Sequence, residues 1–414
     1  MKVIHLALSE NGGAGIAARG SIQALNKIGI TAEFWTAEGG RFSRAIRSHK
    51  WTIARILMDS VPLRFYPRRK IFSAWSNNWQ ASRLAVRVNR EKPDIVHLHW
   101  IGGGFLSLQE LALLNAPVVW TLHDAWAVTG GCHYPEKCLG YVSGCGSCPQ
   151  LASGSQHDLS WRNFHRKRTF IGGVAAFIAP SVWLARLVKD SDGGMAKRLH
   201  IIPNGFDGSV FFPRDLQESR RTLELPLDDL VFVAGAQDLR EPRKGFHLLR
   251  EAMVKIVAAV QRRCVLVAFG EHGQDSFDDW PCEVRWVGTL KEGEETARVY
   301  CAADVLLMTS LQDNLPNMPI EAMACGCPTI AFNVGGLDEI VEPGKTGLLA
   351  AKENSADLGL ATIAWLKNNP DRSDVVPRCR VRFEQHFSDG LHSERLKAVY
   401  ELILMKHPPA RKET

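Results

Sequence analysis

Two carboxylates stand eight positions apart in the most distinctive stretch of the chain, which runs from Thr309 to Thr329. Asp313 comes at the end of an apolar run that predicts a strand. Glu321 lies about one turn into the helix predicted after a loop rich in Pro and Asn. Asp and Glu are rarely buried without a partner, and their oxygens accept hydrogen bonds from hydroxyl groups. The pair therefore suits the hydroxyls of a sugar.

A glycine-rich loop, Asn11-Gly12-Gly13-Ala14-Gly15, joins the first predicted strand to a helix. Glycines let backbone amides at a helix N-terminus come close to an anion, so a phosphate would fit against Gly13. The loop is not Gly-x-Gly-x-x-Gly and lacks the Lys-Ser/Thr of a phosphate-binding NTPase loop, so neither a dinucleotide nor an ATP-driven motor is indicated. A tight turn that binds nothing explains the same glycines and stays the alternative.

Four of the ten cysteines fall in one glycine-rich loop, with the spacing Cys-x5-Cys-x6-Cys-x2-Cys: Cys132, Cys138, Cys145 and Cys148. Four thiolates in one loop can close a tetrahedral zinc site, and a polar loop gains from a metal the rigidity that packing does not supply. Free thiols or a redox pair are the alternative, because only one Cys-x-x-Cys is present. The other six cysteines are scattered in apolar contexts, which indicates buried thiols of a reducing compartment.

The stretch around Glu321 resembles the retaining glycosyltransferases of family 4, whose fold is called GT-B. In that family an acidic residue, seven intervening residues and a Glu precede Ala-Met-Ala-Cys-Gly-x-Pro. Here the acidic residue is Asp313, where the family usually has Glu. The resemblance implies that Asp313 and the amides of Asn314 and Leu315 contact the sugar of a nucleotide-sugar donor, and that Glu321 holds the ribose. The alternative, that Glu321 only caps or ion-pairs in an ordinary helix, leaves the length of the matching run unexplained.

A second match follows the first predicted strand of the second half. Lys244-Gly245 resembles the family's Lys-Gly, whose ammonium binds the donor diphosphate. A fixed cation there would stabilise the negative charge that grows on the leaving group. The family's companion Arg usually stands six positions earlier, where this chain has Asp238. We expect Arg240 to replace it, with Arg243 as the alternative.

Further matches are spread along the chain. His123 ends a predicted strand and resembles the family His that contacts the donor sugar. A lone His is more often structural, but its place at a strand end favours a functional role. The motifs at 203–207 and 335–347 resemble the family's inter-domain Pro-Asn-Gly-Val-Asp and its glycine-rich ending. The cysteine loop, with His-Asp-x-Trp before it, resembles the subset of family 4 that builds bacterial exopolysaccharides, O-antigens and colanic-acid-type polymers.

Short apolar runs alternating with helical periodicity predict the elements that must position these residues. The predicted strands cover 3–8, 95–99, 118–122 and 176–179 in the first half, and 230–234, 265–269, 284–287, 304–308 and 328–332 in the second; a helix is predicted over 16–28. This is the pattern of α/β domains with doubly wound parallel sheets. We expect two Rossmann-like domains, 1–205 for the acceptor, with 388–414 returning to it, and 206–387 for the nucleotide sugar. Ligands of such sheets bind beyond the carboxyl ends of the strands, so we expect the site in a cleft between the domains.

Charge is unevenly distributed over the 414 residues. The whole chain carries +6, whereas residues 41–92 hold thirteen Lys and Arg against Asp59 and Glu91. Aromatic residues such as Trp51 and Phe65 are interleaved with these cations, which suits an anionic membrane surface. A solvated helical face with its aromatics turned inward is the alternative. The first apolar run is too short for a secretory signal, and no window reaches about 18 apolar residues. We therefore expect a cytoplasmic protein bound peripherally to the inner membrane.

The resemblance implies a retaining, hexosyltransferase-type enzyme of exopolysaccharide or lipopolysaccharide biosynthesis. It would move a sugar from a UDP- or GDP-sugar to a hydroxyl of a polyprenyl-diphosphate-linked glycan. No catalytic divalent metal is expected, since Lys244 and helix-end amides would take its place. One alternative is a nucleotide-sugar epimerase of the same fold, which needs further acid and base groups that we cannot place. The other is a zinc-knuckle nucleic-acid-binding protein, which would leave Glu321 without a role.

Overall fold

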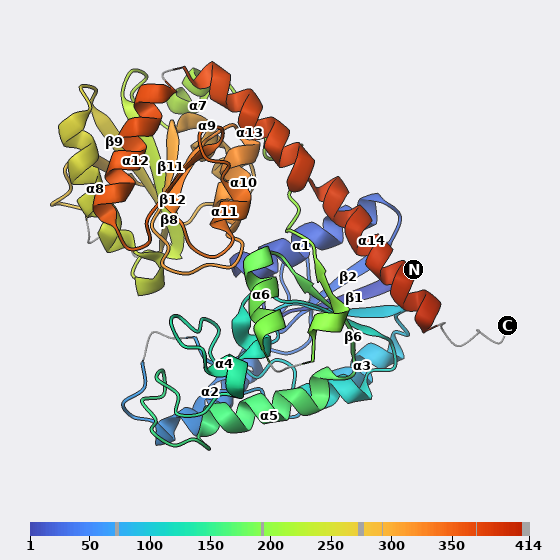
Figure 1. Cartoon of the computed structure of the whole chain (residues 1–414). Coiled ribbons are helices and arrows are strands. Elements are labelled where there is room, and N and C mark those ends of the chain that lie inside the picture. The colour runs from blue at the N-terminus through green and yellow to red at the C-terminus, as the bar shows by residue number, and fades with distance from the viewer. Residues whose placement is uncertain (71–73, 192–193, 272–276, 292, 370, 408–414) are drawn as a thin grey trace. The chain divides into compact units, whose positions relative to one another are not determined.

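The computed structural model describes residues 1–70, 74–191, 194–271, 277–291, 293–369 and 371–407 (Figure 1). Its internal contacts divide the chain into two compact units. The first comprises Met1–Gly205 together with Asp389–Thr414, and the second comprises Phe206–Ser388. The expected domain boundaries, 205 and 387, lie next to these points.

The first unit is built on a seven-stranded parallel sheet in the order β3-β2-β1-β4-β5-β6-β7. The strands are β1 (Lys2–Leu6), β2 (Thr31–Thr36), β3 (Arg44–Ala45), β4 (Ile95–Leu98), β5 (Val118–Thr121), β6 (Val174–Ala179) and β7 (Leu199–Ile201). The central strands β4 and β5 are buried along their whole length because helices cover both faces of the sheet.

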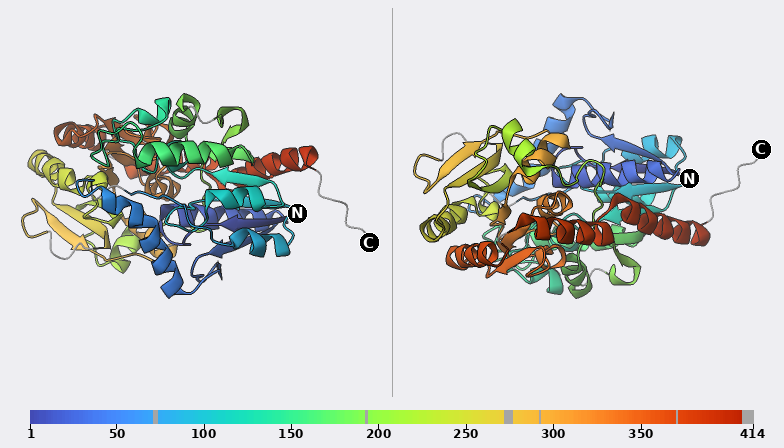
Figure 2. Two further views of the ribbon diagram at one scale, coloured as in Figure 1. Left: turned by 90° about the horizontal axis from the view of Figure 1, so that it is seen from below. Right: turned by 90° about the horizontal axis from the view of Figure 1, so that it is seen from above.

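Two helix layers enclose this sheet. The helices are α1 (Gly12–Lys27), α2 (His49–Ser60), α3 (Leu84–Arg90), α4 (Gly140–Ser143), α5 (Leu159–Ile171), α6 (Val182–Asp190) and α14 (Asp389–Lys406). One face, with Val3 and Ile95, packs on α1 and α14, and the opposite face, with Ile4 and Val96, packs on α3 and α6. The last helix, α14, lies against α1 and β6 (Figures 1 and 2), so the end of the chain completes the first unit.

The second unit has a six-stranded parallel sheet in the order β10-β9-β8-β11-β12-β13. Its strands are β8 (Leu230–Asp238), β9 (Cys264–Glu271), β10 (Glu283–Trp286), β11 (Val305–Met308), β12 (Thr329–Phe332) and β13 (Gly347–Ala350). Its helices are α7 (Leu216–Thr222), α8 (Phe246–Ala259), α9 (Glu294–Ala302), α10 (Asn317–Ala324), α11 (Leu337–Ile340), α12 (Ser355–Asn368) and α13 (Arg372–His386). Adjacent β8 and β11 bring the loops that follow them to one edge of the sheet.

The predicted fold class, two doubly wound parallel-sheet α/β domains, is confirmed, but some elements differ from the prediction. Helix α1 begins at Gly12 and not at residue 16, because the glycine-rich loop is itself the first turn of the helix. Strands β2, β3, β7 and β13 were not predicted. β3 and β7 are only two and three residues long, and β2 mixes polar with apolar residues, so neither kind gives the continuous apolar run used to find the others. Within the described residues, no helix is long and apolar enough to cross a bilayer.

Candidate functional site

Lys244 and Asp313 meet where the loops after β8 and β11 run side by side. The Lys244 Nζ lies 2.6 Å from the Asp313 Oδ2. The two loops are held together by the Leu311 amide, which donates to the Arg243 carbonyl at 2.7 Å. Gly245 allows this approach, because its φ is +62° and a Cβ there would stand 2.1 Å from the Thr309 carbonyl oxygen. Two side chains 69 positions apart in sequence thus form one ion pair at the carboxyl edge of the sheet.

The cations around Asp313 decide its ionisation. The residue is only 8 % exposed, and burial by itself would raise its pKa. The charges of Lys244 and Arg243, with hydrogen bonds from Lys244 and the Asn314 amide, outweigh this and hold the pKa of Asp313 below its ordinary value. Asp313 is therefore a carboxylate at neutral pH, and Lys244 is poised beside it for an anionic ligand.

Glu321 lies in α10, the helix that begins four residues after Asp313. It is 8 % exposed, and the Tyr300 hydroxyl of α9 donates to its Oε2 at 3.0 Å. Burial and the neighbouring carboxylate of Glu321 raise the pKa of Tyr300 well above its ordinary value, so that hydroxyl stays a donor. Sequence analysis missed Tyr300, because nothing in the local pattern of α9 marks it as a partner of a residue 21 positions away.

The loop from Asp313 to Leu315 is fixed by the glycine pair that follows β12. The Gly336 amide donates to the Asn314 carbonyl at 2.7 Å. Gly335 has a φ of +62°, and a Cβ there would lie 1.6 Å from the Asp313 carbonyl oxygen. The glycines at the start of the 335–347 motif therefore allow the loop after β12 to pack closely against the backbone of Asp313 and Asn314.

The structure separates the two arginines offered as companions of Lys244. Arg240, the one we expected, is 62 % exposed in its side chain and pairs with Asp238 at 3.3 Å. Arg243 is 19 % exposed, lies 3.4 Å from Asp313 and donates to the Gln312 carbonyl at 2.8 Å. Arg243, not Arg240, is therefore the arginine that shares a carboxylate with Lys244.

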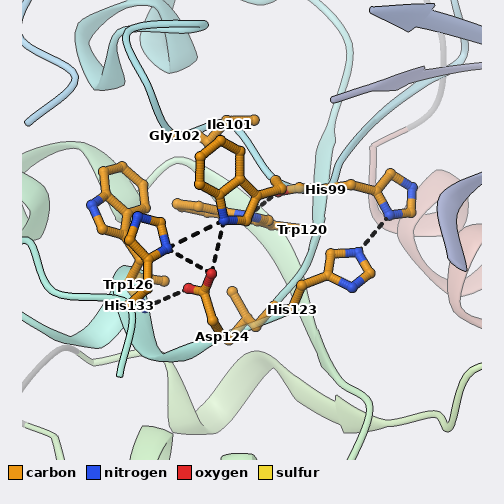
Figure 3. A pocket seen from close by; sticks show the side chains of 11 residues that line it. His99, Ile101, Gly102, Trp120, His123, Asp124, Trp126 and His133 are labelled. Carbon is orange, nitrogen blue, oxygen red and sulfur yellow. Dashed lines mark hydrogen bonds and ion pairs between the residues drawn. The ribbon is translucent and has the colours of Figure 1, made fainter. Parts of the chain in front are cut away.

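His123 follows β5 in the first unit and belongs to a buried polar cluster (Figure 3). Its Nε2 lies 3.0 Å from the His99 Nδ1. Burial lowers the pKa of His123 to about 4, against a smaller opposing effect of the Asp124 charge. His123 is therefore a neutral imidazole at pH 7. The neighbouring Asp124 accepts from the Trp100 indole at 2.8 Å and lies 2.6 Å from His133.

Gly13 lies in the first turn of α1, the helix that follows β1 of the same sheet. Space is open where a Cβ of Gly13 would stand, whereas a Cβ on Gly15 would meet the Glu10 carbonyl at 2.4 to 2.6 Å. Gly15 is thus required for packing, and Gly13 leaves room for a ligand against the helix N-terminus.

The four-cysteine loop lies next to a buried lysine. All four residues are free thiols, with Cys132 and Cys148 buried. Backbone amides donate to three of the sulfur atoms: that of Gly140 to Cys138, that of Gly130 to Cys145, and those of Gln150 and Leu151 to Cys148. Lys167 of α5 is 1 % exposed, and burial lowers its pKa to about 7, although Cys132 and Cys145 oppose this.

Within the described part of the chain, ligating atoms of three histidines, His5, His97 and His99, lie within 4.8 Å of one another. No three sulfur atoms of the cysteine loop, which lies within the described residues, come within that distance of one another. Sequence analysis missed this histidine cluster. The alternation His97-x-His99 was visible, but the pairing of β1 with β4 that adds His5 was not.

Two family models match the chain. One, described as "Glycosyltransferase Family 4", matches residues 11–209, and the other, "Glycosyl transferases group 1", matches residues 228–368. A relative from Escherichia coli named as a putative colanic acid biosynthesis glycosyl transferase, WcaC, is 26 % identical over 83 % of this chain and 85 % of its own length. A D-inositol 3-phosphate glycosyltransferase from Pseudarthrobacter chlorophenolicus is 24 % identical, covering 90 % of this chain and 86 % of the relative.

Solved structures share the fold along nearly the whole chain. Anabaena HepE, crystallised in complex with UDP-glucose, aligns with a TM-score of 0.65 at 18 % identity, covering 97 % of this chain and 100 % of that one. A sucrose-phosphate synthase from Thermosynechococcus elongatus aligns with a TM-score of 0.66, also at 18 % identity, covering 98 % and 99 %.

Proposed function

Because the chain belongs to the glycosyltransferases of family 4 and has the GT-B fold, we propose that it transfers a sugar from a nucleotide-sugar donor to an acceptor hydroxyl with retention at the anomeric carbon. The observation that carries this proposal is the ion pair of Lys244 with Asp313 at the carboxyl edge of the second sheet, one loop away from the buried carboxylate of Glu321. Open α/β sheets bind their ligands at this edge.

Each of these groups has a role in the proposal. Lys244, with Arg243 in the place we first gave to Arg240, binds the donor diphosphate, and the amides at Gly13 of the first unit bind a phosphate. Asp313 and the amides of Asn314 and Leu315 contact the transferred sugar. Glu321 accepts from the ribose hydroxyls while the Tyr300 hydroxyl holds its other side. His123 contacts the sugar as a neutral imidazole, which does not oppose positive charge at the anomeric carbon.

The proposed reaction is attack on the same face that the leaving group departs from. The bond between the anomeric carbon and the phosphate oxygen breaks, and a bond from that carbon to the acceptor oxygen forms. The acceptor's proton passes to the departing phosphate oxygen. Lys244 stabilises the charge that collects on the diphosphate in the transition state.

A nucleotide panel tests the donor site. Ligands that bind only the folded protein raise its melting temperature by mass action, so millimolar UDP or GDP should raise the Tm. We expect Lys244→Ala and Arg243→Ala to reduce this shift, and Arg240→Ala, the matched surface arginine, to leave it as in the wild type. No shift with any nucleoside diphosphate would contradict the proposal. The solved relative with UDP-glucose supports a uridine donor, with a guanosine donor as the second arm of the panel.

For the acceptor we propose a polyprenyl-diphosphate-linked glycan of bacterial surface polysaccharide synthesis. The name of the Escherichia coli relative, colanic acid biosynthesis, supports a polysaccharide product. A donor screen on lipid-linked acceptors with mass-spectrometric detection tests it. A mass increase of one hexose on the lipid-linked glycan is expected, and transfer only to water or to soluble sugars would contradict it.

An exposed apolar surface on α2 and the short helical turn Val61–Phe65 supports this acceptor and a cytoplasmic enzyme at the inner membrane. Among the residues of α2 only Thr52 and Asp59 are buried. The Asp59 carboxylate accepts from the Asn77 and Asn78 amides, so the helix is anchored through polar bonds. Its apolar side chains face solvent instead, among them Trp51, Ile53, Ile56, Leu57 and Met58, with Phe65 82 % exposed on the turn.

The charges around this surface support an anionic bilayer as its occupant. Lys50, Arg64 and Arg68 are exposed beside the apolar side chains. Basic residues flanking exposed aromatic and aliphatic side chains bind interfaces that combine anionic headgroups with acyl chains. A lipid-linked acceptor lies in the same interface, so this surface would bring the enzyme to its substrate.

For the cysteine loop we propose a structural zinc ion held by Cys132, Cys138, Cys145 and Cys148. Backbone amides donate to three of these sulfur atoms and would support metal-bound thiolates, whereas burial raises the pKa of Cys145 and Cys148 in the metal-free loop; the side chain of Lys167 is buried beside the site. The ion would fix the loop and take no part in the transfer.

A further inference from the structure

Three buried histidines of the first unit, His5, His97 and His99, lie close together near His123. His5 of β1 is paired in register with His97 of β4, and His99 follows His97 by two positions, so all three side chains point to the same face of the sheet. That face packs on α1 and α14. His5, His97 and His99 are 0 to 2 % exposed, which removes them from solvent.

Hydrogen bonds connect only some of these rings. His5 Nδ1 lies 2.9 Å from His99 Nε2, and His99 Nδ1 lies 3.0 Å from His123 Nε2 (Figure 3 shows the second contact). His97 takes no part in these two contacts, since its Nδ1 bonds to the Tyr400 hydroxyl and its Nε2 to the Thr121 hydroxyl. His5, His99 and His123 therefore make one continuous line of imidazoles.

Burial keeps the three imidazoles of this line uncharged at neutral pH. It lowers the pKa of His5 to about 3, that of His123 to about 4, and that of His99 well below its ordinary value. A neutral imidazole has one N–H and one bare nitrogen. Each link needs one donor and one acceptor, so the three protons must all lie on Nδ1 or all lie on Nε2.

The far end of the line distinguishes these two arrangements. His5 Nε2 is buried and has no hydrogen-bond partner among the described residues. A proton on that nitrogen would be an orphaned buried N–H, the rarer kind of unsatisfied group in folded proteins. The arrangement with every proton on Nδ1 leaves a bare nitrogen there instead.

We propose that His5 and His99 are positioning residues that fix the tautomer of His123, holding its proton on Nδ1 so that it meets the donor sugar as a hydrogen-bond donor. The tautomer follows from the line of contacts together with the unpartnered Nε2 of His5, whereas its use on a sugar rests on the function proposed above. A donor nitrogen in this place selects a sugar oxygen that accepts.

The same three buried rings could be mistaken for a metal site, because ligating atoms of His5, His97 and His99 lie within 4.8 Å of one another. The rings are nearly parallel, with centroids 4.6 to 5.2 Å apart and planes inclined by 19 to 33°. The nitrogens of His5 and His99 that meet are hydrogen-bonded to each other, and the remaining ring nitrogen of His99 is bonded to His123, so these atoms are engaged along the line and do not converge on one central point. Both nitrogens of His97 are also engaged by hydroxyl groups, so the geometry favours the hydrogen-bonded line.

Nitrogen NMR of the full chain labelled with ¹⁵N-histidine reads the tautomers without any substrate. We expect His5, His99 and His123 all to carry the proton on Nδ1, each signal being assigned by its loss in the corresponding Phe variant. In His99→Phe, His123 Nε2 no longer receives a hydrogen bond, so a tautomer with the proton on Nε2 should appear. His97→Phe is the matched control: it removes an equally buried neighbour and should leave the His123 tautomer unchanged.

Three outcomes would overturn the inference. They are protons on Nε2 along the line in the wild type, a His123 signal unaffected by His99→Phe, and stoichiometric metal that shifts the histidine signals when it is removed by a chelator. Should His99→Phe fail to fold, His99→Asn is the second variant. Its amide keeps a polar group where His99 Nδ1 meets His123, and it removes the Nε2 atom that hydrogen-bonds to His5. The wild-type pattern alone already decides between the two arrangements.

Kinetics separate this inference from the proposed function. Loss of one neutral hydrogen bond to the sugar predicts a rise of roughly fivefold in the donor KM of His99→Phe, with the acceptor KM unchanged and partial recovery in His99→Asn. A merely structural defect would change both KM values together, and that result would overturn the positioning role. If the wild type transfers no sugar but shows the expected tautomers, the proposed function fails and the histidine line stands.

Discussion

At the scale of single residues, the loops after β8 and β11 of the second sheet hold the Lys244 ammonium in a fixed position where it could bind an anion. Lys244 is bound to Asp313 at 2.6 Å, so its ammonium is fixed in place before any ligand arrives. A preorganised cation costs less reorganisation at the moment of reaction than one recruited from solvent. The Lys-Gly and acidic motifs could be recognised in the sequence, but their direct contact depends on β8 lying beside β11.

Glu321 gives the first prediction at this scale. Replacing it with Ala should lower transfer at least about 100-fold, because the buried carboxylate is the proposed ribose acceptor and its donor, Tyr300, would lose its partner. The measurement is turnover with the best donor of the nucleotide panel. Tyr300→Phe is the control that removes the same hydrogen bond but keeps the carboxylate. Unchanged turnover in Glu321→Ala would refute its role.

Asp313 gives a pH-dependent prediction. Its pKa is lower in the folded chain than its ordinary value, so its ion pair contributes stability above the unfolded pKa of about 3.9, and that contribution is lost as the pH falls through the folded pKa. Asp313→Asn should therefore cost about 1.5–3 kcal/mol at pH 7 and much less below pH 3. Denaturant unfolding of the second unit at both pH values measures the difference. An equal loss of unfolding free energy at pH 7 and pH 3 would show that Asp313 contributes through packing and not through its charge.

The choice between Arg240 and Arg243 shows where sequence reasoning stops. They lie in the same loop, four positions and one position before Lys244, and we expected Arg240 to be the companion of Lys244. The short helical turn Pro242–Lys244 decides the matter by turning Arg243 toward Asp313 and leaving Arg240 with Asp238. A turn of this kind depends on contacts with the neighbouring loop, which a local pattern does not contain.

At the scale of elements, α2 is the helix whose burial is the reverse of what its composition suggests. The interpretation of its aromatics as core residues required them to face inward, and the structure turns Trp51 and Leu57 to solvent, at 68 % and 60 % exposure. Periodicity could not decide this, because it shows that a helix has an apolar face but not what that face meets.

The exposed face of α2 predicts binding to anionic vesicles. Replacing Trp51 and Phe65 with Ser, and separately reversing the charges of Arg64 and Arg68, should each weaken binding to phosphatidylglycerol vesicles about tenfold or more. The reason is that acyl and headgroup contacts are both lost in part. Vesicle sedimentation measures this, with neutral phosphatidylcholine vesicles as the reference. Val86→Ser, a change at an exposed apolar side chain of α3, is the matched control. Full retention of binding, or preference for nucleic acid over vesicles, would contradict the membrane assignment.

The cysteine loop predicts a metal content. The purified chain should carry about one zinc ion per molecule. Cys145→Ser should release it and lower the Tm of the first unit, because a loop with few apolar contacts loses its cross-link. Elemental analysis and calorimetry measure the two effects. Cys264→Ser, at a buried thiol outside the loop, is the control for cysteine replacement as such. A metal-free wild type with full stability would contradict the proposed zinc site.

At the scale of the whole molecule, the alternation of strands and helices was enough to predict two doubly wound sheets, because long buried strands leave continuous apolar runs. Its limits are equally physical. β3 and β7 are too short to leave a pattern, and the order of strands within each sheet is set by long-range pairing. The histidine line could not be foreseen for the same reason, since His5 and His99 are 94 positions apart and meet only because β1 pairs with β4.

The return of α14 to the first unit has a consequence for the order in which the protein is made. Tyr400 closes the histidine face by bonding to His97, and Leu396 and Ile403 fill the apolar layer around it. Domains generally fold as they leave the ribosome, starting with the N-terminal one. Here the first sheet is made with the part of one face that α14 covers still exposed, while residues 206–388 emerge and complete their own core. The part of the chain that is synthesised first therefore completes its folding last, and until then it exposes apolar surface of the kind that chaperones bind.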